Sequence, residues 1–154
     1  HMQRVFPLSD RERECLKEQI RSLGLQERVT FLGYVEGEPL RELYRTSDAF
    51  ILPTREDCFG LVILEAMCAS LPVISSKYAD GARDLIRDGE NGYIVDPEDA
   101  DALAQAVTRC FTGSTAAEMG KKSYERAQEF SFSHVAEGCI AAIRSVLHAA
   151  ERIR

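Results

Sequence analysis

Short apolar runs alternate along much of the chain with segments that have helical spacing. Four of these runs predict β-strands, at 28–33, 49–53, 72–75 and 92–95. They are continuous in Val, Ile, Leu and Phe, which is typical of parallel strands covered on both faces. Strand–helix alternation with short loops favours a doubly wound α/β sheet. We therefore expect a mainly parallel sheet of about four strands with helices on both faces.

Helix candidates separate the predicted strands and fill the C-terminal part of the chain. Ser9 is a suitable N-cap for a helix that runs to about Ser22, and Gly24 is a suitable stop. A later helix starts at Pro97, and the last candidate carries an apolar stripe from Phe132 to Leu147. The other candidates cover 39–44, 60–69, 82–87 and 116–128. The pattern thus predicts a sheet domain with a helical C-terminal tail.

Length and composition fit one globular domain. The chain has 154 residues, of which 45% are hydrophobic and 29% are charged, so that it can form a core. A net charge of -6 argues against nucleic-acid binding, because phosphate attraction needs the opposite balance. A single anionic ligand held by backbone dipoles is compatible with that charge. We expect residues 1–154 to form a single domain, and we interpret His1 and Met2 as a cloning scar.

The remaining composition indicates a cytoplasmic protein without a metal site. Apolar stretches such as 61–64 are far shorter than the ~20 residues of a membrane helix, and no secretion signal opens the chain. Five widely spaced cysteines without a C-x-x-C pair suit reduced thiols. Outside the scar the histidines are His134 and His148, which makes a zinc site improbable.

The segment 53–67 is the candidate for chemistry. A predicted strand ends at Pro53, a polar loop follows, and an apolar helix begins near Gly60. Ligands of open α/β sheets bind beyond the carboxyl ends of the strands. The amides of Phe59, Gly60 and Leu61 are first-turn donors at the positive end of a helix dipole, and Gly60 allows close approach. This arrangement predicts an anion site, with a diphosphate as the natural ligand.

Two carboxylates frame this helix start. Asp57 lies in the loop before it, where a role as N-cap is an equally simple interpretation. Glu65 lies in the second turn, and its apolar neighbours predict burial nearly all round. A buried carboxylate needs hydrogen-bond donors, and sugar or ribose hydroxyls would supply them. The alternative for Glu65 is a solvated position on an exposed edge.

Several short motifs occur in the order and with the gaps of a known family. They are Phe31-Leu32-Gly33-Tyr34-Val35, Leu43-Tyr44, Ser47-Asp48-Ala49, Pro53-Thr54, Asp57-x-Phe59-Gly60, Leu64-Glu65-Ala66-Met67, Leu71-Pro72-Val73-Ile74, Gly81 and Asp88-Gly89-x-Asn91-Gly92. Residues 28–107 thereby resemble the C-terminal domain of family 4 retaining glycosyltransferases of GT-B fold, and the helical tail resembles it more loosely. The resemblance implies a Rossmann-like doubly wound parallel sheet that forms most of a nucleotide-sugar-binding domain.

The same resemblance implies roles for particular residues. In that family two acidic residues eight positions apart form the donor-site motif, and Asp57 and Glu65 match them. Glu65 would hold the ribose hydroxyls of the nucleotide, and Asp57 would face hydroxyls of the transferred sugar as the catalytic-site carboxylate. The amides of Phe59–Leu61 would take sugar and phosphate oxygens. Tyr34 and Val35, in the loop after a strand, would lie near the nucleobase.

The chain departs from the family pattern at several positions. Asp57 stands where the family more often has Glu. Ser70 stands where Gly is usual after this helix, so it has to accept a left-handed turn. Arg83-Asp84 replaces the usual Pro-Glu. The family's diphosphate-binding Arg and Lys lie in opening strands that this chain lacks. Arg55 could substitute in part, although a solvated loop arginine is the simpler interpretation.

The resemblance implies a fragment of a glycosyltransferase of the hexosyltransferase type. The parent would transfer a sugar from a nucleotide-sugar to a hydroxyl of a glycan or lipid-linked acceptor, with retention. No cofactor or metal is expected, because helix N-termini and basic residues can balance the diphosphate charge. The acceptor-binding N-terminal domain is absent from this chain, so we expect the isolated chain to be inactive and able to self-associate through an exposed sheet edge.

Two alternatives stay open. A nucleotide-sugar epimerase of GT-B fold would share the architecture but usually lacks the paired acidic motif. A non-catalytic module that binds a sugar nucleotide or a protein would fit the missing half of the cleft, whereas the motif at 57–65 argues against it.

Overall fold

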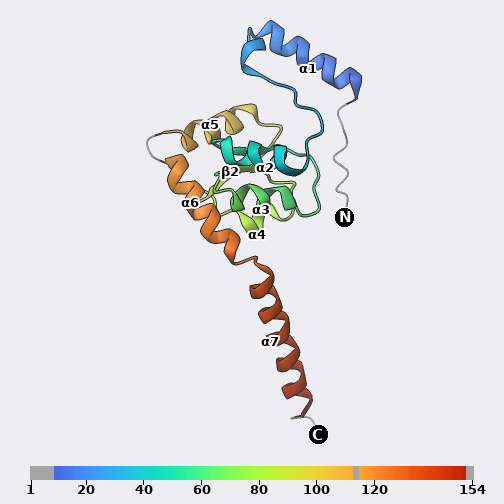
Figure 1. Ribbon diagram of the computed structural model, residues 1–154, viewed down its shortest axis with the longest axis vertical. Coiled ribbons are helices and arrows are strands. Elements are labelled where there is room, and N and C mark those ends of the chain that lie inside the picture. Colours follow the sequence, from blue (N-terminus) through green and yellow to red (C-terminus); the bar gives the residue numbers. More distant parts are fainter. Residues whose placement is uncertain (1–8, 113–114, 152–154) are drawn as a thin grey trace. The chain divides into compact units, whose positions relative to one another are not determined.

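The computed structural model describes residues 9–112 and 115–151, and the chain divides into two units, His1–Glu42 and Leu43–Arg154. Figure 1 shows the order of the elements along the chain. The helix α2 (Gly37–Thr46) spans the division. The second unit then contains, in order, β1 (Phe50–Leu52), α3 (Leu61–Cys68), β2 (Val73–Ser76), α4 (Ala82–Leu85), β3 (Gly92–Val95), α5 (Ala100–Cys110), α6 (Thr115–Gln128) and α7 (Phe132–Glu151).

The first unit contains α1 (Asp10–Ser22) and the 3-10 helix η1 (Gln26–Arg28). A capping box starts α1, because Ser9 accepts a hydrogen bond from the Glu12 amide and Glu12 accepts one from the Ser9 amide. Gly24 follows the helix with a φ of 67°. The limits predicted for this helix are therefore confirmed.

The strand predicted at 28–33 is wrong. Arg28 ends η1, and the residues after it form no strand with any described part of the chain. An apolar run becomes a strand only when a neighbouring strand accepts and donates its backbone hydrogen bonds. The sequence pattern shows that the segment contains apolar residues. It does not show whether a neighbouring strand is present to pair with them.

The sheet of the second unit is parallel and has the order β1-β2-β3 in the described residues. Phe50 lies opposite Val73, and Val73 in turn lies opposite Gly92. The helix α3 connects the first pair of strands and α4 connects the second. These are the strands predicted at 49–53, 72–75 and 92–95, so three of the four predicted strands are confirmed.

Both faces of the sheet are covered at its central strand, β2. All four residues of β2 are buried, and successive side chains of a strand point to opposite faces. Val73 packs in one core cluster with residues of α3 and α4, including Ile63 and Leu85. Ile74 packs in a second cluster with Cys110 of α5 and Met119 of α6. The doubly wound arrangement explains why the strand sequences are apolar without alternation.

Asn91 connects the turn before β3 to β2 and α6. Its Oδ1 accepts the Arg87 amide at 2.7 Å, and its Nδ2 donates to the Leu85 carbonyl at 3.2 Å. Its own carbonyl accepts the Val73 amide at 3.2 Å and the Ser123 hydroxyl at 2.9 Å. This buried side chain therefore satisfies the backbone of a turn that two other elements pack against.

The N-terminal limit of α5 differs from the predicted one because an N-cap residue sets it. The helix predicted from Pro97 begins at Ala100, because Asp99 is its N-cap and accepts the Ala102 amide at 2.9 Å. Ser70, after α3, has a φ of 60°, which confirms the left-handed turn expected there. Among the described residues no other non-glycine has a positive φ.

The apolar stripe of α7 is exposed, as are all residues of 132–146. The large side chains that α7 exposes by half or more are Phe132 (97%), Val135 (52%), Ile140 (50%), Ile143 (60%) and Val146 (68%). An exposed apolar face of this extent is typical of an interaction surface.

We predict opposite effects for two buried serines. Ser75 on β2 is fully buried, and its hydroxyl has no hydrogen-bond partner among the described residues. Ser75→Ala removes an unpaired polar group and should leave the free energy of unfolding unchanged or raise it by up to about 2 kcal/mol. Ser123→Ala removes the bond to Asn91 and should lower the free energy of unfolding by about 1 kcal/mol. Urea denaturation of both variants tests this, and a loss for Ser75→Ala equal to that for Ser123→Ala would contradict it.

Candidate functional site

The loop 53–60 is held against the loop that follows β2. Asp57 forms an isolated parallel bridge with Ala79. The Asp57 amide donates to the Tyr78 carbonyl at 3.3 Å, and the Asp57 carbonyl accepts the Asp80 amide at 3.1 Å. The pairing of β1 with β2 thus resumes beyond the ends of the strands. It places Asp57 at the carboxyl end of the sheet, as the sequence predicts.

The side chain of Asp57 closes the turn into α3. Its Oδ1 accepts the Phe59 amide at 3.0 Å. The prediction that the Phe59 amide is an open donor is therefore wrong, because an Asx turn already uses it. Gly60 is the N-cap of α3 with a φ of 75°, and it supplies no side-chain acceptor. The first-turn amide of Leu61 has no intrahelical acceptor, and Gly60 is buried. The role of these two amides as donors for an anion stays a prediction.

Two positions at this turn favour glycine, Gly81 for lack of space and Gly60 mainly for its backbone conformation. A Cβ on Gly81 would overlap the carbonyl oxygen of Phe59. A Cβ on Gly60 would lie 2.9 Å from Cδ1 of Ile63, and the positive φ at Gly60 adds backbone strain for any other residue. Gly81 has an ordinary φ of -69°, so its requirement for glycine is one of space alone.

Glu65 lies on the exposed side of α3. The residues of α3 that face the core are Ile63, Ala66 and Met67, all fully buried. The burial predicted for Glu65 on nearly all sides is therefore wrong. The reason is geometric: α3 buries one stripe against the sheet, and Glu65 shares the opposite stripe with Leu61, one turn before it. The solvated position considered for Glu65 is the one that the structure shows.

Tyr44 is the hydrogen-bond donor that faces Glu65. Its hydroxyl donates to Glu65 Oε2 at 3.2 Å from the last turns of α2. Burial raises the pKa of the Tyr44 phenol well above its usual range, and the Glu65 charge and the hydrogen bond raise it further. Burial also raises the pKa of the Cys68 thiol, and the charge of Glu65 raises it further. The motif Leu43-Tyr44 marked this tyrosine in the sequence but indicated no role for it.

Arg55 is exposed but paired. Its Nε donates to Glu98 Oε1 at 2.6 Å, and a second guanidinium nitrogen lies 3.3 Å from Oε2. The hydrogen bond and the charge of Glu98 raise the pKa of Arg55. The pair connects the loop before Asp57 to the segment after β3. A second ion pair, between Lys77 and Asp96, connects the segment after β2 to the same segment after β3.

Tyr34 and Val35 belong to the unit His1–Glu42. Tyr34 is exposed, and its hydroxyl donates to Glu36 Oε2 at 2.8 Å, which raises the pKa of Tyr34. Val35 is half-buried. The structure brings Asp57, Gly60 and Glu65 together in the other unit, so the nucleobase role of Tyr34 and Val35 stays a prediction.

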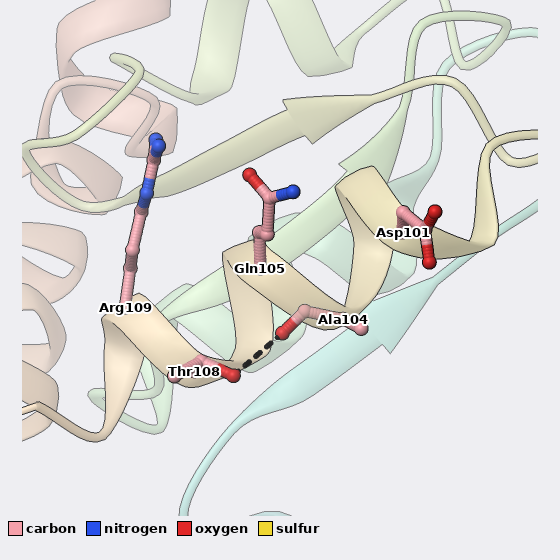
Figure 2. A pocket seen from close by; sticks show the side chains of 5 residues that line it. All are labelled: Asp101, Ala104, Gln105, Thr108 and Arg109. Atoms are coloured by element: carbon pink, nitrogen blue, oxygen red, sulfur yellow. Dashed lines mark hydrogen bonds between the residues drawn. The ribbon is translucent and has the colours of Figure 1, made fainter.

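Apart from this loop, the features of the described residues that bear on function are a hollow, the grouping of metal-ligand side chains and the length of the apolar helices. A hollow of about 380 Å³ runs along one side of α5. Figure 2 shows its lining, which includes none of the predicted site residues: Asp101, Ala104, Gln105, Thr108 and Arg109. Within 9–112 and 115–151 no three His, Cys, Asp or Glu side chains are grouped to hold a metal ion. No helix in the same residues is long and apolar enough to cross a membrane.

Residues 9–129 match the family described as "Glycosyl transferases group 1". The chain therefore belongs to this glycosyltransferase family. It is 34% identical over 132 residues to the D-inositol 3-phosphate glycosyltransferase of Rhodococcus erythropolis, which covers 85% of this chain and 30% of that protein. It is 37% identical over 97 residues to an uncharacterized glycosyltransferase of Methanocaldococcus jannaschii, which covers 63% and 25%.

Solved structures agree with the fold. The sucrose-phosphate synthase of Thermosynechococcus elongatus superposes with a TM-score of 0.74 at 32% identity, over 92% of this chain and 36% of that one. HepE of Anabaena in complex with UDP superposes with a TM-score of 0.75 at 29% identity, over 88% and 37%. The α/β fold predicted from the sequence is thus that of GT-B glycosyltransferases. The matched part of this chain spans only 25–37% of the length of these relatives.

We predict that Gly81→Ala disturbs the turn that carries Asp57. The added methyl would press on the Phe59 carbonyl, and overpacking of this kind should lower the free energy of unfolding by about 1–3 kcal/mol. Amide chemical shifts of Asp57, Phe59 and Gly60 should move. Gly138→Ala is the matched control, because a Cβ there meets nothing within 4 Å. A Gly81→Ala variant with wild-type stability and wild-type shifts in this loop would show that the contact has no structural role.

Proposed function

We propose that residues 1–154 form most of the donor-binding domain of a group 1 glycosyltransferase. The observation that carries the proposal is the position of two carboxylates at one helix start: Asp57 lies just before α3, and Glu65 lies in its second turn. Asp57 is fixed by the bridge to Ala79, and Glu65 presents its carboxylate on the exposed stripe of α3. Anabaena HepE, of the same fold at 28–29% identity, has been solved with UDP and with UDP-glucose. Those complexes support a nucleotide-sugar as the ligand here.

Each group has a distinct proposed contact. The Glu65 carboxylate accepts the ribose hydroxyls of the nucleotide. The amides of Gly60 and Leu61 donate to phosphate or sugar oxygens at the positive end of α3. Asp57 uses one oxygen for the Phe59 amide and turns the rest of its carboxylate toward hydroxyls of the transferred sugar. The Phe59 amide joins the ligand contacts only if Asp57 releases it.

For the parent protein we propose sugar transfer with retention, of the hexosyltransferase type, to a hydroxyl of a glycan or lipid-linked acceptor in the cytoplasm. The relatives are roughly two and a half to three times as long as this chain, so an acceptor-binding N-terminal domain has room in the remainder. Metal is not needed in this proposal, because backbone amides at α3 offset the diphosphate charge. An epimerase or a binding module remains the alternative, and the paired acidic residues favour the transferase over both.

Titration with UDP tests the donor site. We expect a dissociation constant on the order of millimolar, since two or three charge-assisted hydrogen bonds exceed the cost of immobilising the ligand only modestly. Amide shifts of Gly60 and Leu61 should move. Glu65→Gln should weaken binding while the fold survives, because it keeps the shape and removes the charge. Asp57→Asn should change UDP binding little, because UDP lacks the sugar that Asp57 contacts.

Glu137→Gln on α7 is the matched control, since it makes the same change at another exposed glutamate. GDP in place of UDP tests whether the base matters. The donor-site proposal is wrong if Glu65→Gln binds UDP as tightly as wild type, or if the shifts that move exclude Gly60 and Leu61.

We also predict that the isolated chain transfers no sugar. Catalysis requires donor and acceptor to be held together, and the proposed acceptor domain lies outside this chain. An assay with radiolabelled UDP-sugars and simple acceptors should show no product above the rate without protein. Reproducible turnover by the 154 residues alone would refute this. Because the sheet of the described residues ends at β1 and β3, we further expect concentration-dependent self-association, which sedimentation would detect.

A further inference from the structure

We propose that Tyr44 is a positioning residue of this site, which holds the Glu65 carboxylate in the orientation that accepts both hydroxyls of a ribose. The inference rests on the proposed role of Glu65 in nucleotide binding. It adds to the acidic motif a residue of another helix, α2. Tyr44 lies 21 positions before Glu65 in the chain.

The donor group is anchored by packing. Tyr44 is half-buried, and its ring lies 5.8 Å from the ring of Phe50 at an interplanar angle of 51°. Both rings pack against the core cluster that contains Ile63 and Met67 of α3. The position of the phenol oxygen is therefore set by the core, and the hydroxyl reaches the exposed stripe of α3 from a fixed point.

The hydrogen bond has one possible direction. An ionised carboxylate only accepts, and burial next to Glu65 keeps the Tyr44 phenol protonated, because its pKa lies well above the usual range. The bond at 3.2 Å uses one acceptor position of Oε2. It leaves the second position of Oε2 and all of Oε1 for a ligand.

The hydrogen bond from Tyr44 restricts the rotamers of Glu65 before a ligand arrives, which lowers the entropic cost of binding. An exposed glutamate samples several rotamers, and ordering it when a ligand arrives lowers the affinity. A carboxylate that Tyr44 already orients presents two oxygens side by side, which matches the adjacent 2′- and 3′-hydroxyls of a ribose. The ligand class that gains from this geometry is a ribonucleoside diphosphate, and one that lacks the diol does not gain.

The experiment compares two ligands on the same variants. Tyr44→Phe keeps the packed ring and removes the hydroxyl. It should weaken binding of UDP about three- to tenfold and leave binding of 2′,3′-dideoxyuridine diphosphate within about twofold of wild type. In a Glu65→Gln background, Tyr44→Phe should have no further effect on UDP. Tyr124→Phe, the same change at an exposed tyrosine of α6, is the matched control and should bind both ligands as wild type.

A second measurement needs no ligand. The carboxyl carbon resonance of Glu65 should shift in Tyr44→Phe and not in Tyr124→Phe, because only the former loses the hydrogen bond. Thermal unfolding of Tyr44→Phe checks that the fold is retained.

The outcomes separate this inference from the proposed function. If Tyr44→Phe weakens both ligands equally, the effect is structural and the positioning role is wrong. If Glu65→Gln weakens UDP binding but Tyr44→Phe neither weakens it nor shifts the Glu65 resonance, the positioning role alone is wrong. If Glu65→Gln also binds UDP as wild type does, the donor-site proposal fails, and the positioning role fails with it.

Discussion

The parallel pairing of β1 with β2 is the interaction on which the candidate site depends. It continues past both strands as the bridge between Asp57 and Ala79, which fixes the backbone of the loop that enters α3. Gly81 permits this approach, because any side chain there would collide with the Phe59 carbonyl. A loop with its own backbone hydrogen bonds to a neighbouring segment can hold a helix start in one place, which a free loop cannot do.

The two acidic residues of the site are held by different means. Asp57 is ordered locally, by the bridge and by the amide of Phe59 two residues later. Glu65 is ordered from a distance, by a phenol on α2 that the core anchors. A hydrogen bond within a turn forms wherever the turn forms, whereas the Tyr44 contact exists only when α2 and α3 are packed together. The geometry of the proposed donor site is thus coupled to the packing of α2 against α3.

The sheet could be predicted from the sequence because its signal is chemical and local. Strands buried on both faces are largely apolar, and Val73 and Ile74 of β2 lie in two separate core clusters as that pattern predicts. The segment 28–33 shows the limit of this signal. Half of its residues are hydrophobic, as in β2, but pairing depends on a neighbour that an apolar pattern does not reveal.

By itself the sequence determined the family, the parallel strands, the place of the acidic motif and the left-handed turn at Ser70, because each depends on residue types at short spacing. Only the tertiary structure decided which side of α3 meets solvent, and with it that Glu65 is exposed instead of buried. It likewise decided that the Phe59 amide is closed by Asp57 and that Tyr44 faces Glu65. These are contacts set by how helices pack on the sheet, and composition and spacing along one chain do not specify that packing.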